Sequence, residues 1–198
     1  KLLRYFKNLK QLIVFIPKDI QWEKLTRSFS ILKNLKALNL HIDFVDQLAC
    51  ESLGRAINQL KKLKYLSIHG FGFKSRNIAK SALYQSLERI KNLKNLNLSM
   101  SINFDTAAVE FINMNREIER LTIHLVHKFG SLRNSFDKLN IPPTLKCFSF
   151  YVFQGCEELN KNDIKAIKKQ LLKTSNNWQD LKKLEVNYNI FFYPESIS

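Results

Sequence analysis

Cysteine is scarce in this chain, and the positions of its three residues exclude two common uses of this amino acid. The number of cysteines is odd, and no two of them are spaced as Cys-x-x-Cys. They are Cys50, Cys147 and Cys156. Neither a disulfide framework nor a cysteine-based zinc site is expected from such a set. A reducing compartment is the simpler expectation, so we predict a cytoplasmic protein, with nuclear or cytoskeletal association left open.

Glycine, proline and long hydrophobic runs are also rare. Five glycines and four prolines in 198 residues leave little room for a linker, so residues 1–198 are expected to form a single domain. No run of 18 apolar residues occurs, and we therefore expect no membrane insertion. Because the first residue is Lys1 rather than Met, we expect the chain to be an excerpt of a longer protein.

Acidic residues are heavily outnumbered by basic ones. The chain has 17 Asp and Glu against 32 Lys and Arg, which gives a formal net charge of +15. Such an excess favours an acidic partner. The 24 lysines outnumber the 8 arginines, whereas specific binding of phosphates and bases favours arginine. Codon bias in an AT-rich genome is a second explanation for the lysines.

The common catalytic and nucleotide-binding motifs are missing. The chain contains no GxxxxGK[ST], GxGxxG, HExxH or GxSxG pattern. We therefore predict that it is not an enzyme and has no catalytic residues, cofactor or small-molecule substrate.

One phrase of six residues recurs along the chain. It reads LKALNL at 35–40, LKYLSI at 63–68 and LKNLNL at 93–98. The relaxed pattern apolar-x-x-apolar-x-apolar adds four copies, which begin at residues 9, 118, 145 and 181. Successive starts are separated by 26, 28, 30, 25, 27 and 36 residues. This even spacing indicates a repeat architecture.

Each repeat is predicted to contain a strand and a helix. The end of the phrase alternates apolar, polar, apolar, which is typical of a strand. Between the phrases, apolar residues recur at helical spacing over 49–60, 83–93 and 164–172. Asp105 is a candidate N-cap for a further helix at Thr106–Glu110. One such unit cannot bury its own apolar face, so stacked units are expected to share a continuous core.

These repeats resemble the leucine-rich-repeat family, most closely its ribonuclease-inhibitor-like and F-box-associated types, from about Leu9 to Phe191. The resemblance implies an α/β fold: a solenoid of about seven repeats, with a parallel sheet on its concave side and helices on its convex side. Strands lie about 4.8 Å apart and helices about 10 Å apart. That mismatch predicts an open horseshoe arc with the strands inside.

The chain departs from the family at the ninth position of the motif, where Asn or Cys is expected. Only the last copy, with Asn189, fits. We expect phenylalanines that follow the strands to replace the missing asparagine ladder with an aromatic spine, and an exposed aromatic strip is the alternative. The residues are Phe44, Phe71, Phe73, Phe104, Phe129, Phe153 and Phe191.

Motif positions 2, 3, 5 and 7 are expected to face the concave side. Position 2 is lysine in six of the seven copies, and we predict that this column binds an acidic partner. The alternative is a solvated face with no specific role. The candidate binding residues at this position are Lys36, Lys64, Lys94, Lys146 and Lys182.

Position 7 carries three of the four histidines, namely His41, His69 and His124. We predict that they contact the partner together with Tyr151 at the same position and Tyr65 at position 3. No metal site is predicted, because a third and a fourth ligand are missing. Position 5 is small and neutral in most copies, which predicts a shallow floor between the two columns.

The surface suggests two functions, and the family resemblance suggests a third. The first is a non-catalytic protein–protein interaction scaffold that binds an acidic protein or an assembly subunit on a basic concave face. The second is a nucleic-acid or ribonucleoprotein-binding module, which the net charge favours and the scarcity of arginine opposes. The third, implied by the resemblance alone, is the substrate-recognition arm of an F-box-type ubiquitin ligase.

Overall fold

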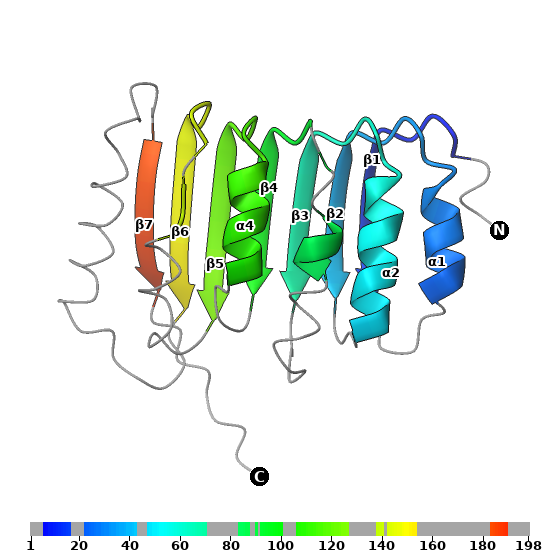
Figure 1. The fold of residues 1–198 in the computed structure, drawn as a ribbon, viewed down its shortest axis with the longest axis horizontal. Coiled ribbons are helices and arrows are strands. Elements are labelled where there is room, and N and C mark those ends of the chain that lie inside the picture. Colours follow the sequence, from blue (N-terminus) through cyan, green and yellow to red (C-terminus); the bar gives the residue numbers. More distant parts are fainter. Residues whose placement is uncertain are drawn as a thin grey trace, which may run out of the picture.

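A computed structural model describes residues 6–16, 22–42, 47–70, 83–87, 90, 92–100, 106–126, 138–140, 142–153 and 183–189. Seven strands in these segments form one sheet in which each strand pairs in parallel with the next one along the chain (Figure 1). The strands are β1 (Gln11–Ile16), β2 (Ala37–Ile42), β3 (Tyr65–Gly70), β4 (Asn95–Met100), β5 (Arg120–Val126), β6 (Cys147–Phe153) and β7 (Lys183–Asn189).

Equivalent residues of the recurring phrase pair with one another across the sheet. Leu38 pairs with Leu66, and Leu66 pairs with Leu96. The same register continues through Leu121 and Phe148. Each copy of the phrase therefore supplies one strand, and the prediction of an α/β fold with a parallel sheet is confirmed.

The described helices lie on one face of this sheet (Figure 1). They are α1 (Trp22–Phe29), α2 (Gln47–Asn58) and α4 (Thr106–Met114), with a short helical segment at 83–86. Helical spacing in the sequence runs on to Leu60 and Leu93, but both residues are buried in the turns that precede β3 and β4. The predicted helix at 164–172 and the N-cap Asp105 lie outside the described residues.

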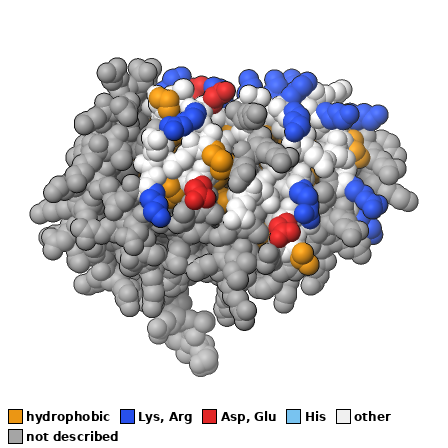
Figure 2. All heavy atoms as spheres, in the orientation of Figure 1, with side chains coloured by type: hydrophobic (Ala, Val, Ile, Leu, Met, Phe, Trp, Pro, Cys, Tyr) orange, Lys and Arg blue, Asp and Glu red, His pale blue; other side chains and the backbone are white. Residues whose placement is uncertain are grey.

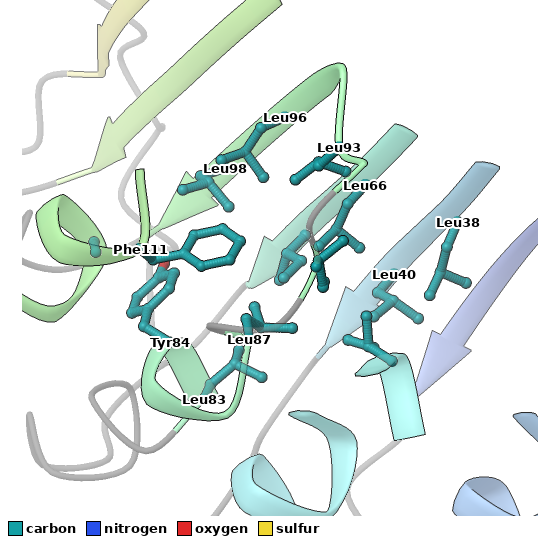
Figure 3. Packing of buried hydrophobic residues seen from close by; sticks show 14 of the residues in the cluster. Leu38, Leu40, Leu66, Leu83, Tyr84, Leu87, Leu93, Leu96, Leu98 and Phe111 are labelled. Carbon is teal, nitrogen blue, oxygen red and sulfur yellow. The ribbon is translucent and has the colours of Figure 1, made fainter. Parts of the chain in front are cut away.

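The core lies between the sheet and the helices. Along β2, Leu38, Leu40 and Ile42 are buried while the residues between them are half-buried. Figure 3 shows the strand leucines packed around Leu83, Tyr84 and Leu87 of the helical layer, with Phe111 of α4 close to Tyr84. The rings of Tyr84 and Phe111 lie 6.1 Å apart between centroids. Alternation along each strand thus places one row of apolar side chains per repeat into a shared core.

Helix α2 and the helical segment at 83–86 approach each other very closely at a glycine. A Cβ added to Gly54 would overlap the Cβ of Ser86. Asn58 Nδ2 at the end of α2 donates a hydrogen bond to the carbonyl of Ser86. These contacts tie the two helical segments together above β2 and β3.

The expected aromatic spine is not among the side chains that the structure describes. Phe44, Phe71, Phe73, Phe104, Phe129 and Phe191 lie outside the described residues, and of Phe153 only the backbone is described. The spine therefore stays a prediction.

Candidate binding surface

The sheet face opposite α1, α2 and α4 is here called the open face, since no helix of the described segments covers it (Figure 1). Where side chains are described, it carries motif positions 3, 5 and 7 of the strands. In β2 these residues are half-buried, because the neighbouring strands shield them on both sides. In β1 the residues Ile13 and Phe15 are 62% and 72% exposed. Two large apolar side chains therefore face solvent on the first strand of the sheet.

A repeated backbone pattern places motif position 2 just before each strand. The Lys10 carbonyl accepts hydrogen bonds from two successive N–H groups, of Lys36 at 2.8 Å and of Ala37 at 3.0 Å. The Lys36 carbonyl accepts two in the same way, from Lys64 at 2.8 Å and Tyr65 at 3.0 Å. Two N–H groups directed at one acceptor interrupt the alternation of the strand, as in a bulge. Positions 2 and 3 are consequently both accessible, although position 4 is buried.

This pattern aligns the position-2 lysines in a row along the edge of the sheet at which the strands begin. We call Lys10, Lys36, Lys64, Lys94 and Lys146 the lysine row. Figure 2 shows Lys and Arg side chains gathered along this edge. Lys182, predicted to extend the row, lies outside the described residues.

The lysine row is divided into an unpaired half and a paired half. Among the described residues, none forms an ion pair with Lys10, Lys36 or Lys64, and all three are exposed. Lys94 Nζ lies 3.1 Å from Glu117 and 3.5 Å from Glu119.

Glu119 stands at position 2 of the fifth repeat and interrupts the row. Its carboxylate also accepts a hydrogen bond of 2.8 Å from Lys146 Nζ. The hydrogen bond from Lys146, with the nearby positive charges, lowers the pKa of Glu119. The hydrogen bond to Glu117 is the main cause that raises the pKa of Lys94. The lysines of the row are therefore paired with carboxylates at β4–β6, whereas no described residue pairs with those at β1–β3.

The position-7 residues form stacked rings on the open face, and we call Phe15, His41, His69, His124 and Tyr151 the ring row. Phe15 stacks on His41 with centroids 4.5 Å apart, and His41 stacks on His69 at 4.8 Å. His124 stacks on Tyr151 at 4.6 Å. Ser99 of β4 pairs with both His69 and His124 and divides the row into two stacks. His41 and His69, which share motif position 7, therefore stack directly on each other.

Two histidines of the ring row are shielded enough to resist protonation. Burial lowers the pKa of His69, and the neighbouring His41 lowers it further. Burial also lowers the pKa of His124, with a smaller contribution from His69. Because these shifts favour the neutral imidazole, His69 and His124 contribute uncharged, amphipathic surface to the ring row.

Polar side chains at position 5 form a floor between the two rows. Ser67 is fully buried, and its Oγ lies 2.7 Å from His69 Nε2. It pairs in register with Asn39 and Asn97, whose Oδ1 atoms are buried and meet no hydrogen-bond partner in the described part of the chain. A buried acceptor that loses its water and gains no hydrogen bond lowers the free energy of unfolding. The floor is therefore polar and partly desolvated along β2–β4, and its shallow shape stays a prediction.

The structure brings most of the predicted binding residues onto one side of the molecule. Tyr65 is half-buried directly after Lys64 at the start of β3. The prediction placed positions 5 and 7, which include Ile13 and Phe15, on the concave side but did not name these two as binding residues. It missed a second set of lysines three residues before the first. The signal for that set is the longer repeat Lys-Asn-Leu-Lys at 7–10, 33–36 and 91–94, with Lys-Lys-Leu-Lys at 61–64.

The described residues offer little for metal or thiol chemistry. No three His, Cys, Asp or Glu side chains among them are arranged to hold a metal ion. Cys50 is buried in α2 and Cys147 is half-buried at the start of β6, and neither forms a disulfide with another described residue. Cys156 lies outside the described residues.

The chain matches no protein-family model. A search of curated proteins finds no significant match either. None of the helices in the described segments has the length and hydrophobicity required to cross a bilayer.

Proposed function

We propose that the chain is a leucine-rich-repeat solenoid that acts as a non-catalytic scaffold and binds an acidic protein partner through its open face. The repeat spacing, the strand order and the in-register pairing of equivalent leucines support this architecture. Narrow strand spacing against wide helix spacing would curve the stack, with the open face inside. In this proposal the scaffold belongs to a reducing compartment such as the cytoplasm, because its three cysteines are odd in number and form no Cys-x-x-Cys pair.

The observation that carries the binding function is the exposed apolar end of the open face. Ile13 and Phe15 are both more than half exposed, and Phe15 begins a stack of rings that continues through His41 to His69. Rings held in a stack lose little side-chain entropy on binding, and aromatic residues are enriched in protein interfaces. A protein partner would cover the apolar side chains and contact the rings.

The charge of the partner is inferred from the lysine row. Three lysines at the edge of the open face have no ion pair within the described residues, and the whole chain carries +15. Like charges in neighbouring strands repel one another. Carboxylates of a partner would relieve that repulsion and accelerate association.

The proposal is tested with variants of the open face. Chains that co-purify with the protein are identified by mass spectrometry, and the Kd of the purified partner is then measured. The double variant Ile13→Ser with Phe15→Ser is expected to weaken binding at least tenfold, about 1.4 kcal/mol. The control is Leu48→Ser in α2, because Leu48 is equally apolar and 73% exposed but lies on the helical side. The control should retain the wild-type Kd. Loss of binding in the control alone, with the double variant unchanged, would refute the proposal.

A further inference from the structure

Seven lysines gather in the three turns that lead into β1, β2 and β3, and we call them the lysine edge. The described parts of these turns, 6–10, 30–36 and 59–64, contain no aspartate or glutamate. All seven side chains are exposed. The residues are Lys7, Lys10, Lys33, Lys36, Lys61, Lys62 and Lys64.

The lysine edge has a defined geometry because polar bonds connect the three turns. Each turn is closed by a backbone hydrogen bond, such as Leu35 N to the Leu32 carbonyl at 3.0 Å and Leu63 N to the Leu60 carbonyl at 3.0 Å. Asn34 Nδ2 donates to the carbonyl of Lys7 at 3.2 Å. Lys62 Nζ in turn donates to Asn34 Oδ1 at 2.8 Å. Neighbouring turns are therefore held about 4.8 Å apart, the spacing of the strands they precede.

The other half of the same edge is only partly neutralised: its described residues include two glutamates, Glu117 and Glu119, against four cations, Lys94, Arg116, Arg120 and Lys146. There Glu117 and Glu119 lie within 4 Å of Lys94, and Glu119 also pairs with Lys146. At physiological ionic strength charges further apart than about 8 Å are largely screened. A polyanion that approaches the strand starts therefore meets seven lysines and no acid before β1–β3, but four cations and two acids before β4–β6, and is attracted more strongly to β1–β3.

We infer that the lysine edge binds a run of glutamate or aspartate residues in an extended segment of the partner chain. This inference rests on the proposed function and specifies where the acidic part of the partner lies. Extended polypeptide rises about 3.3 Å per residue, so four to six residues would cross all three turns. The flexible lysine stems would accommodate the mismatch between that rise and the strand spacing.

A polypeptide fits this surface better than a nucleic acid does. None of the seven cations is arginine, the side chain that binds phosphates with bidentate geometry. The exposed Ile13 and Phe15 lie on β1, directly after Lys10, and one polypeptide can supply carboxylates to the edge and apolar groups to these residues. Phe6, 44% exposed, and Tyr65 also lie near the edge and would offer bases a surface to stack on. The experiment must therefore include a nucleic-acid probe.

The test measures binding of a fluorescein-labelled octaglutamate peptide at about 0.15 M ionic strength. The edge variant is Lys36→Gln with Lys64→Gln. The matched control is Lys94→Gln with Lys146→Gln, which removes two charges from the paired half of the same row. Because exposed ion pairs contribute little each, we expect the Kd of the edge variant to rise about fivefold. The Kd of the control should change less than twofold.

Three results would overturn the inference. Equal weakening in both variants would show attraction by net charge alone. Absence of peptide binding to the wild-type protein would show that the edge is not a site. Tighter binding of a single-stranded oligothymidylate, lost in the edge variant, would assign the edge to nucleic acid.

Failure of this inference is separable from failure of the proposed function. The double variant of Ile13 and Phe15 should bind octaglutamate as the wild type does, because neither side chain carries charge. If the edge variant binds octaglutamate normally while the Ile13 and Phe15 variant still loses the natural partner, only the lysine-edge inference fails.

Discussion

Lys146 Nζ lies 2.8 Å from Glu119 Oε2, in the turns that precede β6 and β5. The two residues occupy equivalent positions of neighbouring repeats, where most repeats carry lysine. Backbone pairing holds them in this register, since the N–H of Lys146 donates to the Glu119 carbonyl at 2.8 Å. This single acid in a row of bases thus pairs with the lysine on each side of it, Lys94 and Lys146.

The first prediction concerns removal of this acid. Glu119→Gln should destabilise the fold at pH 7, because it leaves Lys94 and Lys146 without that carboxylate. The folded-state pKa of Glu119 is lowered, so its stabilisation is present above the ordinary glutamate pKa of about 4.3. It is lost as the pH falls through the folded-state value. Urea unfolding should give a lower free energy of unfolding for the variant than for the wild type at neutral pH, and equal values in acid. A difference unchanged in acid would mean that the ion pairs do not cause it.

The second prediction concerns the shielded histidines. Burial lowers the folded-state pKa of His69 and His124, whereas the unfolded chain titrates near pH 6.5. Below about pH 6.5 the unfolded state binds protons that the folded state does not, so the free energy of unfolding should fall as the pH decreases. It should level off below the folded-state pKa values. His69→Gln should reduce the fall between about pH 7 and pH 5.5. An identical slope in the variant would contradict this assignment.

The third prediction concerns the close approach of α2 to the helical segment at 83–86. Gly54→Ala should destabilise the protein by about 1–3 kcal/mol, the usual cost of overpacking, although alanine is the better helix former. Replacement of Ser86 by glycine in the same chain removes the overlapping Cβ and should recover part of the loss. A double-mutant cycle measures this coupling. Strictly additive effects would show that the two residues do not meet.

The fourth prediction concerns repulsion within the lysine edge. Lys36 lies between Lys10 and Lys64 in register and has no ion pair within the described residues. Lys36→Gln should therefore stabilise the protein by roughly a few tenths of a kcal/mol at low salt. Screening should erase the gain as the salt concentration rises towards about 1 M. Lys146→Gln should instead destabilise the protein, because it removes the attractive ion pair with Glu119. Urea unfolding at two salt concentrations distinguishes the two signs.

Much of the sheet could be predicted because its information is local and repeated. The phrase that contains Leu38 recurs around Leu66 and Leu96, and side-chain alternation in strands fixes which residues face the core. The helical segments were harder to delimit. Ile90 and Leu93 continue a helical spacing but are buried in a turn before β4, because apolar spacing does not distinguish a helix end from a turn that packs on the same core.

The candidate surface was only partly predictable from sequence. The pairing of His41 with His69 follows from strand register, and their stacking was foreseeable. The division of the lysine row was not, because it depends on which way the Glu119 carboxylate extends between two neighbouring strands. The exposure of Phe15 depends on the position of β1 at one end of the sheet order, which no local pattern encodes.

The account is tested most directly by site-specific photo-crosslinking on the two sides of the sheet. A benzophenone amino acid is placed at Phe15 on the open face and, in a second protein, at Leu48 on α2, since both positions are about equally exposed. Irradiation in the presence of the natural partner should produce the crosslinked complex from position 15 and little or none from position 48. Crosslinking from position 48 with none from position 15 would place the partner on the helices and contradict the account.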